Sequence, residues 1–296
     1  MWVPITLAAT TFQILRTSRQ HQLRSALSTA AAGFIRYLYG APLALGLSAV
    51  LFGALGHRVP SIPGHFWPVV AGAGIAQILA TVALLQAFKV RDFAIGTAYS
   101  KAEVILVAVV GAIGLGEPLQ PLGWVGALLV TAGVAWLAAR GSIASVVQRA
   151  GDPAALLGLV AGGFFALASV GIRGASNSLG DAPAFDRAVL TLTAMLVVQT
   201  FVNTAWFLVR DPAEIRRTVS AWRPAVPVGV LSLLGSVAWA WAMTLENAAK
   251  VRTLGQVELV IAFLIARISL GERHGRRDLV ASGVVLVGVL VVTLYG

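Results

Sequence analysis

Apolar residues dominate the chain in long blocks, and charged residues fall mostly between these blocks. An α-helix needs about 20 mostly apolar residues to cross the hydrocarbon core of a bilayer, which is roughly 30 Å thick. Ten blocks approach or exceed this length. The predicted spans are 2–20, 30–53, 66–88, 93–115, 121–139, 154–173, 184–209, 224–246, 251–270 and 278–295. The pattern therefore predicts an all-α integral membrane protein with ten transmembrane helices.

The continuity of the blocks argues against a transmembrane barrel, whose strands alternate between apolar and polar residues. A helix also satisfies its own backbone hydrogen bonds, as any segment exposed to lipid must. With 58% hydrophobic residues, 11% charged residues and a mean hydropathy of +0.85, the composition lies outside the range of soluble domains. The short stretches between the predicted helices leave no room for a soluble domain.

The two halves of the sequence repeat each other at an offset of 155 residues. The matched pairs are Glu103 with Glu258, Glu117 with Glu272, Val130 with Val285 and Gly133 with Gly288. Five helices per half is an odd number, so the two halves are expected to cross the membrane in opposite senses. This predicts two inverted five-helix repeats, residues 1–145 and 152–296, with the substrate site near the membrane midplane.

The net charge of +10 comes from basic residues spread over the inter-helical loops, without a basic domain to bind nucleic acid. Arginines that flank membrane helices explain this charge better. The absence of cysteine excludes disulfides and cysteine-ligated metals. The sequence has no phosphate-binding loop and no hydrolase motif, so no cofactor and no enzyme activity are expected. The four histidines fall in loops without ligand spacing and are predicted to be solvated groups, not a metal site: His21, His57, His65 and His274.

A doubled motif links the two repeats to a known family. The motif residues are Leu115-Gly116-Glu117 with Gly126 and Gly133, and Leu270-Gly271-Glu272 with Gly283 and Gly288. With this pattern the chain resembles ten-helix members of the drug/metabolite transporter superfamily of the EamA-domain type. Many members have proline where this chain has Glu103 and Glu258, so the two carboxylates mark a subgroup.

The resemblance implies secondary transport of small metabolites, including amino acids, without ATP. It also implies that both termini lie in the cytoplasm. The Lys and Arg count of the loops predicts the opposite orientation, because the loops on the side away from the termini carry most of the positive charge. Both orientations stay open at this point.

Two carboxylates and two arginines lie within predicted membrane helices at equivalent positions of the repeat. A charge in hydrocarbon needs a partner, a water-filled cavity or a proton. Glu103 and Glu258 could therefore pair with Arg36 and Arg187, bind the ammonium of a substrate, or take up and release protons during transport. The two arginines could anchor their helices at the interface, or clamp a substrate carboxylate or phosphate with their planar guanidinium groups.

The helix that carries Glu103 is expected to be irregular at its start. The repeat offset falls from 161 at the Lys-Val-Arg triplets, residues 89–91 and 250–252, to 155 at the glutamates, so the first half has six extra residues here. This insertion predicts a first helical turn that is unwound or lengthened. Lys101, which matches Gln256 in the second half, could then approach Glu103 although an intact helix would separate them.

Aromatic residues complete the candidate substrate- or proton-binding set, which comprises Glu103, Glu258, Arg36, Arg187, Trp239, Tyr99, Gln256 and Lys101. Trp239 lies in the middle of a predicted helix, away from the interfacial belt that tryptophan usually occupies. It could face lipid, or line a cavity together with Tyr99 and favour a flat apolar group.

The sequence thus favours a secondary transporter in a bacterial inner membrane that moves small amphipathic or zwitterionic metabolites by alternating access. Amino acids are the expected substrate class, export is the expected direction, and protons are a candidate coupling ion. One alternative is an exchanger of anions or sugar phosphates. Another is a membrane scaffold or sensor without transport, which would bury each intramembrane charge in a closed pair.

Overall fold

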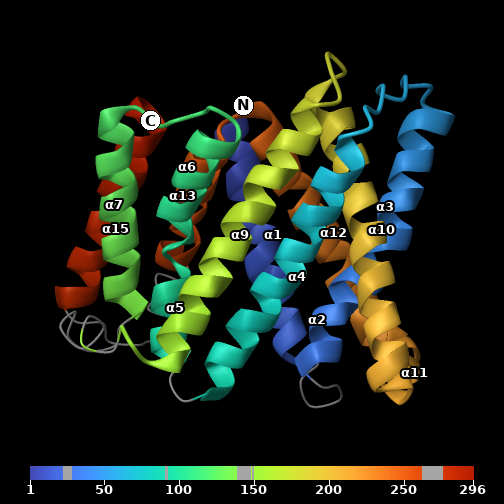
Figure 1. Ribbon diagram of the computed structural model, residues 1–296, viewed down its shortest axis with the longest axis horizontal. Coiled ribbons are helices and arrows are strands. Elements are labelled where there is room, and N and C mark those ends of the chain that lie inside the picture. The colour runs from blue at the N-terminus through green and yellow to red at the C-terminus, as the bar shows by residue number, and fades with distance from the viewer. Residues whose placement is uncertain (23–28, 91–92, 139–147, 149, 262–275) are drawn as a thin grey trace. The chain divides into compact units, whose positions relative to one another are not determined.

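The computed structural model describes residues 1–22, 29–90, 93–138, 148, 150–261 and 276–296. These residues are helical almost throughout and include no β-strand (Figure 1). The helices are α1 (Trp2–Gln22), α2 (Thr29–Leu38), α3 (Gly40–Ala49), the π-helix η2 (Val50–Ala54), α4 (Phe66–Val90), α5 (Phe93–Ser100), α6 (Glu103–Gly114), α7 (Pro121–Ala138), α9 (Pro153–Asn177), α10 (Ala184–Arg210), α11 (Pro212–Ser220), α12 (Trp222–Leu245), α13 (Ala248–Gly255) and α15 (Arg276–Tyr295).

Seven helical stretches of the described residues are long and apolar enough to cross a membrane. They are Gly33–Ala54, Phe66–Lys89, Ile95–Gly114, Pro153–Asn177, Ala184–Arg210, Trp222–Leu245 and Arg276–Tyr295. Each corresponds to one of the ten predicted spans, which confirms an all-helical membrane protein. The predicted span 2–20 corresponds to helix α1, and the predicted span 121–139 corresponds to the shorter apolar helix α7. Part of the predicted span 251–270 lies outside the described residues. The total of ten spans stays a prediction.

The chain divides into two compact units. Unit 1 comprises Met1–Ile78 and Gly171–Glu246, and unit 2 comprises Leu79–Val170 and Asn247–Gly296. Each unit thus combines a segment from the first sequence half with a segment from the second half. Neither unit coincides with a predicted repeat, and the division of the chain into repeats stays a prediction.

In unit 1, α12 is the helix around which the other helices are arranged. It packs against α1, α10, α2 and α3. Small residues permit the close approach: a Cβ atom added to Gly229 would lie 2.6 Å from the Cβ of Tyr39 on the α2 side, and one added to Gly235 would lie 3.4 Å from the Cβ of Phe12 in α1. Glycines at these contacts let the helices pack at short range, as is usual inside membranes.

In unit 2, α7 and α15 lie side by side along a seam of small residues (Figure 1). A Cβ atom added to Gly288 of α15 would lie 2.7 Å from the backbone oxygen of Gly126 in α7 and 2.8 Å from the backbone nitrogen of Val130. The neighbouring atoms are backbone atoms, so a side chain at Gly288 would separate the two helices.

Gly288→Ala is therefore expected to destabilise the protein by about 2 kcal/mol, since overpacking a tight contact typically costs 1–3 kcal/mol. Gly283→Ala, in the same helix, is the matched control because its new methyl group would meet nothing within 4 Å. The control should be neutral or stabilising by up to about 1 kcal/mol, the helix-propensity gain of alanine. Thermal unfolding of the two purified variants in one detergent measures the difference, and equal melting temperatures would contradict the seam.

Candidate functional site

The first predicted site residue, Glu103, lies directly after an interruption between two helices of unit 2. Helix α5 ends at Ser100, Lys101 and Ala102 form a turn, and α6 begins at Glu103. Hydrogen bonds between residues three apart define the turn, from Lys101 N to Ala98 O (3.2 Å) and from Ala102 N to Tyr99 O (3.1 Å). The predicted irregularity is thus present, but it was expected in the first turn of the 93–115 helix and instead follows the eight residues of α5.

A second interruption follows Gly255, where α13 ends. Gln256 forms a turn, with its backbone nitrogen donating to Thr253 O at 3.1 Å, and helix resumes at Val257 and is described as far as Ile261. Gln256 matches Lys101 at the offset of 155 residues, so both interruptions occupy equivalent positions of the sequence repeat.

The start of α13 is fixed by Asn247. Its side-chain oxygen accepts a hydrogen bond from Ala249 N at 2.8 Å, which caps the helix, and its amide nitrogen donates to the backbone oxygen of Glu117 at 3.0 Å. An N-cap of this kind satisfies one of the free N–H groups of the first turn. Asn247 therefore holds the start of α13 against the Leu-Gly-Glu motif that follows α6.

A buried ion pair joins the two interrupted helices. The guanidinium of Arg252 in α13 contacts the carboxylate of Glu103 at the start of α6, and the exposed fractions of the two side chains are 18% and 5%. The positive end of the α6 dipole also favours a carboxylate at this position. Pairing removes the cost of isolated charges in a bilayer, which is roughly 2.5–3.5 kcal/mol for Asp, Lys or Arg on an insertion scale. The partner of Glu103 is thus Arg252, whereas sequence analysis considered Arg36 and Arg187.

Gln256 lies one helical turn after Arg252, and its side chain points back toward the backbone of Arg252. It is 5% exposed, and its amide nitrogen donates to the backbone oxygen of Arg252 at 3.3 Å. Its buried side-chain oxygen accepts no hydrogen bond within the described part of the chain. Such an oxygen is costly to leave without a donor, so this position is suited to a donor that arrives with a ligand.

Helix α9 packs directly on the first interruption through two glycines spaced four residues apart. A Cβ atom added to Gly162 would lie 2.8 Å from Ser100 O and 3.1 Å from Glu103 N, and one added to Gly158 would lie 2.5 Å from Gly96 O. The backbone of α9 thus supports the turn that positions Glu103.

The structure places the other predicted residues as follows. Tyr99 and Lys101 are half-buried and immediately precede Glu103, and Glu258 is half-buried in the helical segment after Gln256. Arg36, Arg187 and Trp239 belong to unit 1. There Arg187 donates to the side-chain oxygen of Asn177 at 3.3 Å, and the Trp239 indole donates to that of Gln13 at 3.2 Å. Unit 2 thus brings Glu103 and Gln256 together with Arg252, a residue that the candidate set had omitted.

Unit 1 has buried and half-buried polar groups of its own, which the predicted site residues do not include. The fully buried Gln199 in α10 donates to Gly74 O (3.2 Å) and to the side-chain oxygen of Gln77 (2.8 Å) in α4. Arg173 in α9 donates to Met243 O (2.7 Å) and caps the carbonyl end of α12. Both residues could have been identified from the sequence, because they are polar residues inside predicted membrane spans.

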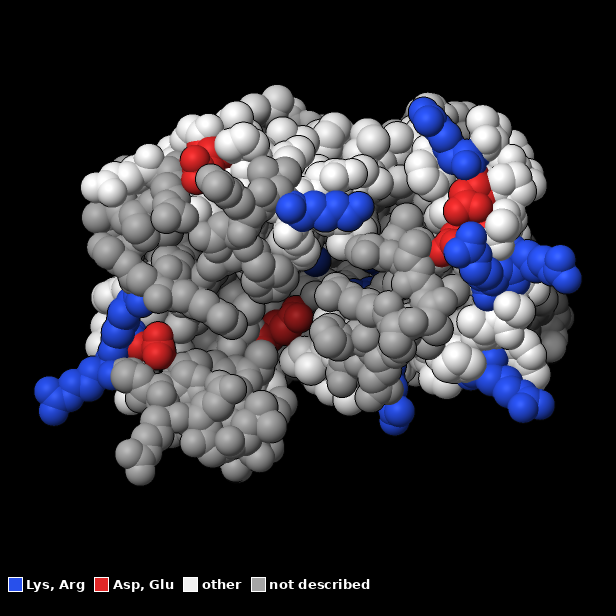
Figure 2. Space-filling model, turned by 90° about the horizontal axis from the view of Figure 1, so that it is seen from below, with Lys and Arg blue, Asp and Glu red and all other residues white. Residues whose placement is uncertain are grey.

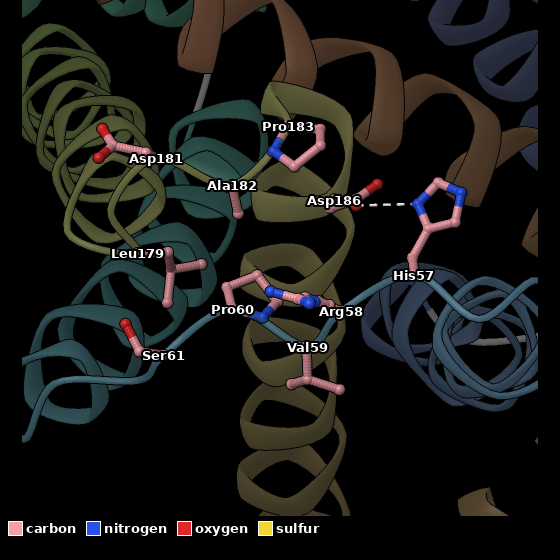
Figure 3. Close-up of a pocket in the computed structure, with 10 residues that line it drawn as sticks. All are labelled: His57, Arg58, Val59, Pro60, Ser61, Leu179, Asp181, Ala182, Pro183 and Asp186. Carbon is pink, nitrogen blue, oxygen red and sulfur yellow. Dashed lines mark hydrogen bonds and ion pairs between the residues drawn. The ribbon is translucent and has the colours of Figure 1, made fainter.

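A pocket of about 480 Å³ lies at one end of unit 1, between the connection after η2 and the start of α10. Nδ1 of His57 lies 2.9 Å from the carboxylate of Asp186, which is nearly fully buried, while Asp181 points away from this pair (Figure 3). His57 is exposed to solvent, as predicted, and its imidazole also partners this buried carboxylate. Among the described residues, no group of three or more potential ligands is placed to hold a metal ion.

His57→Ala is expected to destabilise the protein by about 1–3 kcal/mol, because it leaves the buried Asp186 carboxylate without its imidazole partner. His65→Ala is the matched control, since His65 is an exposed residue of the same connection and surface substitutions usually change stability by less than 0.5 kcal/mol. Thermal unfolding in detergent measures both, and a His57 variant as stable as the control would show that the contact contributes nothing.

Three comparisons with known proteins bear on the family and the fold. The EamA-like transporter family matches residues 152–294. A curated relative from Sinorhizobium sp., "Uncharacterized transporter in cobO 3'region", is 34% identical over 77 residues, which cover 26% of this chain and only about half (55%) of the relative. A solved structure described as "Crystal structure of protein" is similar over 99% of this chain and 97% of its own, with a TM-score of 0.70. At 18% identity that similarity shows the fold alone.

Proposed function

Because residues 152–294 belong to the EamA-like transporter family, we propose that this membrane transporter moves small zwitterionic metabolites, with amino acids as the first class to test. The family resemblance that the doubled Leu-Gly-Glu motif predicts is confirmed by this match. Substrate, direction and mechanism are parts of the proposal. The proposal also includes ten helices in two inverted repeats, alternating access, export and a bacterial inner membrane.

The observation that carries the proposal is the buried Glu103–Arg252 pair at two interrupted helices. In secondary transporters, interrupted helices near the membrane midplane commonly form the sites for substrates and coupling ions. The equivalent positions of the two interruptions support an inverted repeat around such a site, because each repeat then contributes one broken helix.

The chemistry of the pair matches the two ends of an amino acid. The guanidinium of Arg252 presents a planar fork to a carboxylate, and the carboxylate of Glu103 accepts hydrogen bonds from an ammonium group. The free side-chain oxygen of Gln256 adds a further acceptor for the ammonium. A substrate that inserts between the two residues exchanges one ion pair for two, so neither side chain is left uncompensated.

The ion pair also keeps the site neutral when no substrate is bound. Without substrate, Glu103 and Arg252 neutralise each other, and the helices can change their arrangement without an unpaired ion in the bilayer. A proton on Glu103 would offer a second way to release Arg252, which makes protons the candidate coupling ion. No chemical step on the substrate is required.

Counterflow in proteoliposomes tests the proposal. Vesicles loaded with one unlabelled metabolite receive the labelled form outside, and the panel includes neutral amino acids, sugar phosphates and quaternary ammonium compounds. Accumulation of a labelled amino acid over protein-free vesicles supports the proposal. Accumulation of sugar phosphates alone would establish the anion exchanger instead, and the absence of flux across the panel would favour a scaffold or sensor.

A further inference from the structure

Helix α11 lies at the membrane interface of unit 1. The spans Ala184–Arg210 and Trp222–Leu245 flank it closely, so the nine residues of α11 connect two helices at the same membrane surface. Its end is fixed by the hydroxyl of Tyr39, which contacts the backbone oxygens of Thr218 (3.1 Å) and Val219 (3.3 Å). Figure 1 shows α11 at the end of α10, next to α2.

The two acidic groups of α11 and its cap share one basic partner, Arg217. Arg217 contacts the buried carboxylate of Glu214 at 3.2 Å and reaches the carboxylate of Asp211 at 3.6 Å. Both acidic residues therefore have a basic partner in the same short helix and its cap. Together with Arg210, Arg216 and Arg223, these three residues leave this part of unit 1 with a net charge of +2.

Three further arginines, Arg210, Arg216 and Arg223, form what we call the arginine surface. All three are exposed, and none has an acidic partner among the residues that the structure describes. Seen from below, the end of the molecule that carries α11 displays a group of Lys and Arg side chains around acidic ones (Figure 2).

Apolar side chains next to the arginine surface place it at headgroup depth. Val209 is 83% exposed at the end of α10, and Trp206 and Trp222 are about half exposed on either side of α11. Exposed valine is suited to the hydrocarbon region, and tryptophan is enriched where hydrocarbon meets the headgroups. The guanidinium groups, which flank these residues along the chain, therefore lie at the level of lipid phosphates.

From this arrangement we propose that the arginine surface binds the headgroups of anionic phospholipids, with phosphatidylglycerol as the simplest example. Charge complementarity selects this occupant, because three exposed cations that have no acidic partner among the described residues lie in the layer that contains lipid phosphate. Guanidinium binds phosphate through paired hydrogen bonds. Each arginine near a membrane surface contributes a factor of about five in affinity for anionic lipid, so three together give roughly a hundredfold preference.

Native mass spectrometry of the full chain tests this proposal independently of transport. The protein is equilibrated with equal amounts of phosphatidylglycerol and phosphatidylcholine of the same acyl chains, and the retained lipids are counted. The wild type is expected to retain phosphatidylglycerol preferentially, and the triple variant Arg210→Gln/Arg216→Gln/Arg223→Gln to lose most of that preference. Single variants should each reduce it about fivefold.

Arg58→Gln is the matched control, because Arg58 is an exposed arginine at the opposite end of α10. It should leave the preference unchanged. A triple variant that retains the preference, or a control that reduces it equally, would overturn the proposal. Displacement of the lipid by millimolar inorganic phosphate would do the same, since it would show a site for free phosphate. Unchanged melting temperatures of the variants in phosphatidylcholine confirm that they fold.

Discussion

Replacing Glu103 with Gln is expected to reduce substrate exchange about tenfold to a hundredfold in proteoliposomes. The change removes the acceptor of the substrate ammonium, and a lost hydrogen bond between charged groups costs about 1.5–3 kcal/mol. It also removes the carboxylate that the partly buried Arg252 contacts, which should lower the stability of the protein as well. Transport and stability should therefore fall together in this single variant.

The double variant Glu103→Leu/Arg252→Met separates a transport role from a structural role. Replacing both partners of a buried ion pair with apolar residues of similar volume is often neutral for stability. The double variant should therefore regain the melting temperature of the wild type while its exchange stays as low as that of Glu103→Gln. Recovery of both quantities would show that the pair is only structural. Lys89→Gln, at an exposed lysine of unit 2, controls for charge removal as such.

Gly162→Ala has the second-largest expected effect, a loss of exchange of at least about tenfold. Its methyl group would lie 2.8 Å from Ser100 O and 3.1 Å from Glu103 N. These are backbone atoms of the interruption, so α9 and the start of α6 must separate. A displacement of about 1 Å at a binding group is enough to cost one or two orders of magnitude.

Gly163→Ala provides the matched control for this prediction, since the new methyl group meets nothing within 4 Å although the position is adjacent in the same helix. Exchange by this variant should equal that of the wild type. If the two alanine variants transport equally well, the packing of α9 on the interruption does not position Glu103. Melting temperatures measured in parallel show how much of the loss at Gly162 reflects unfolding.

Much of the fold could be predicted because hydropathy encodes it directly. Seven predicted spans coincide with long apolar helices, since an apolar block of this length has few alternatives in a membrane. The interruptions at Lys101 and Gln256 could not be located in the same way. The 93–115 block is apolar on both sides of the turn, and the turn depends on the contact of Gly162 with Ser100, which is distant in sequence.

The candidate site was predicted in part for a related reason. Glu103 and Gln256 were found because a polar residue inside an apolar block carries a signal of its own. Arg252 was omitted because it occurs in a Lys-Val-Arg triplet that resembles a basic flank of a helix. Only the three-dimensional arrangement places it against Glu103. The contact of His57 with Asp186 was not predicted for the same reason, since the two residues lie 129 positions apart.

Competition by three related compounds tests the central claim most directly, namely that Glu103 and Arg252 bind the two ends of one substrate. The compounds are the transported amino acid, the amine that lacks its carboxylate and the acid that lacks its ammonium group. Each competes with counterflow of the labelled amino acid by the wild type. The account predicts that the amino acid competes at least about tenfold better than either one-ended compound. Equal competition by the amine or by the acid would contradict it.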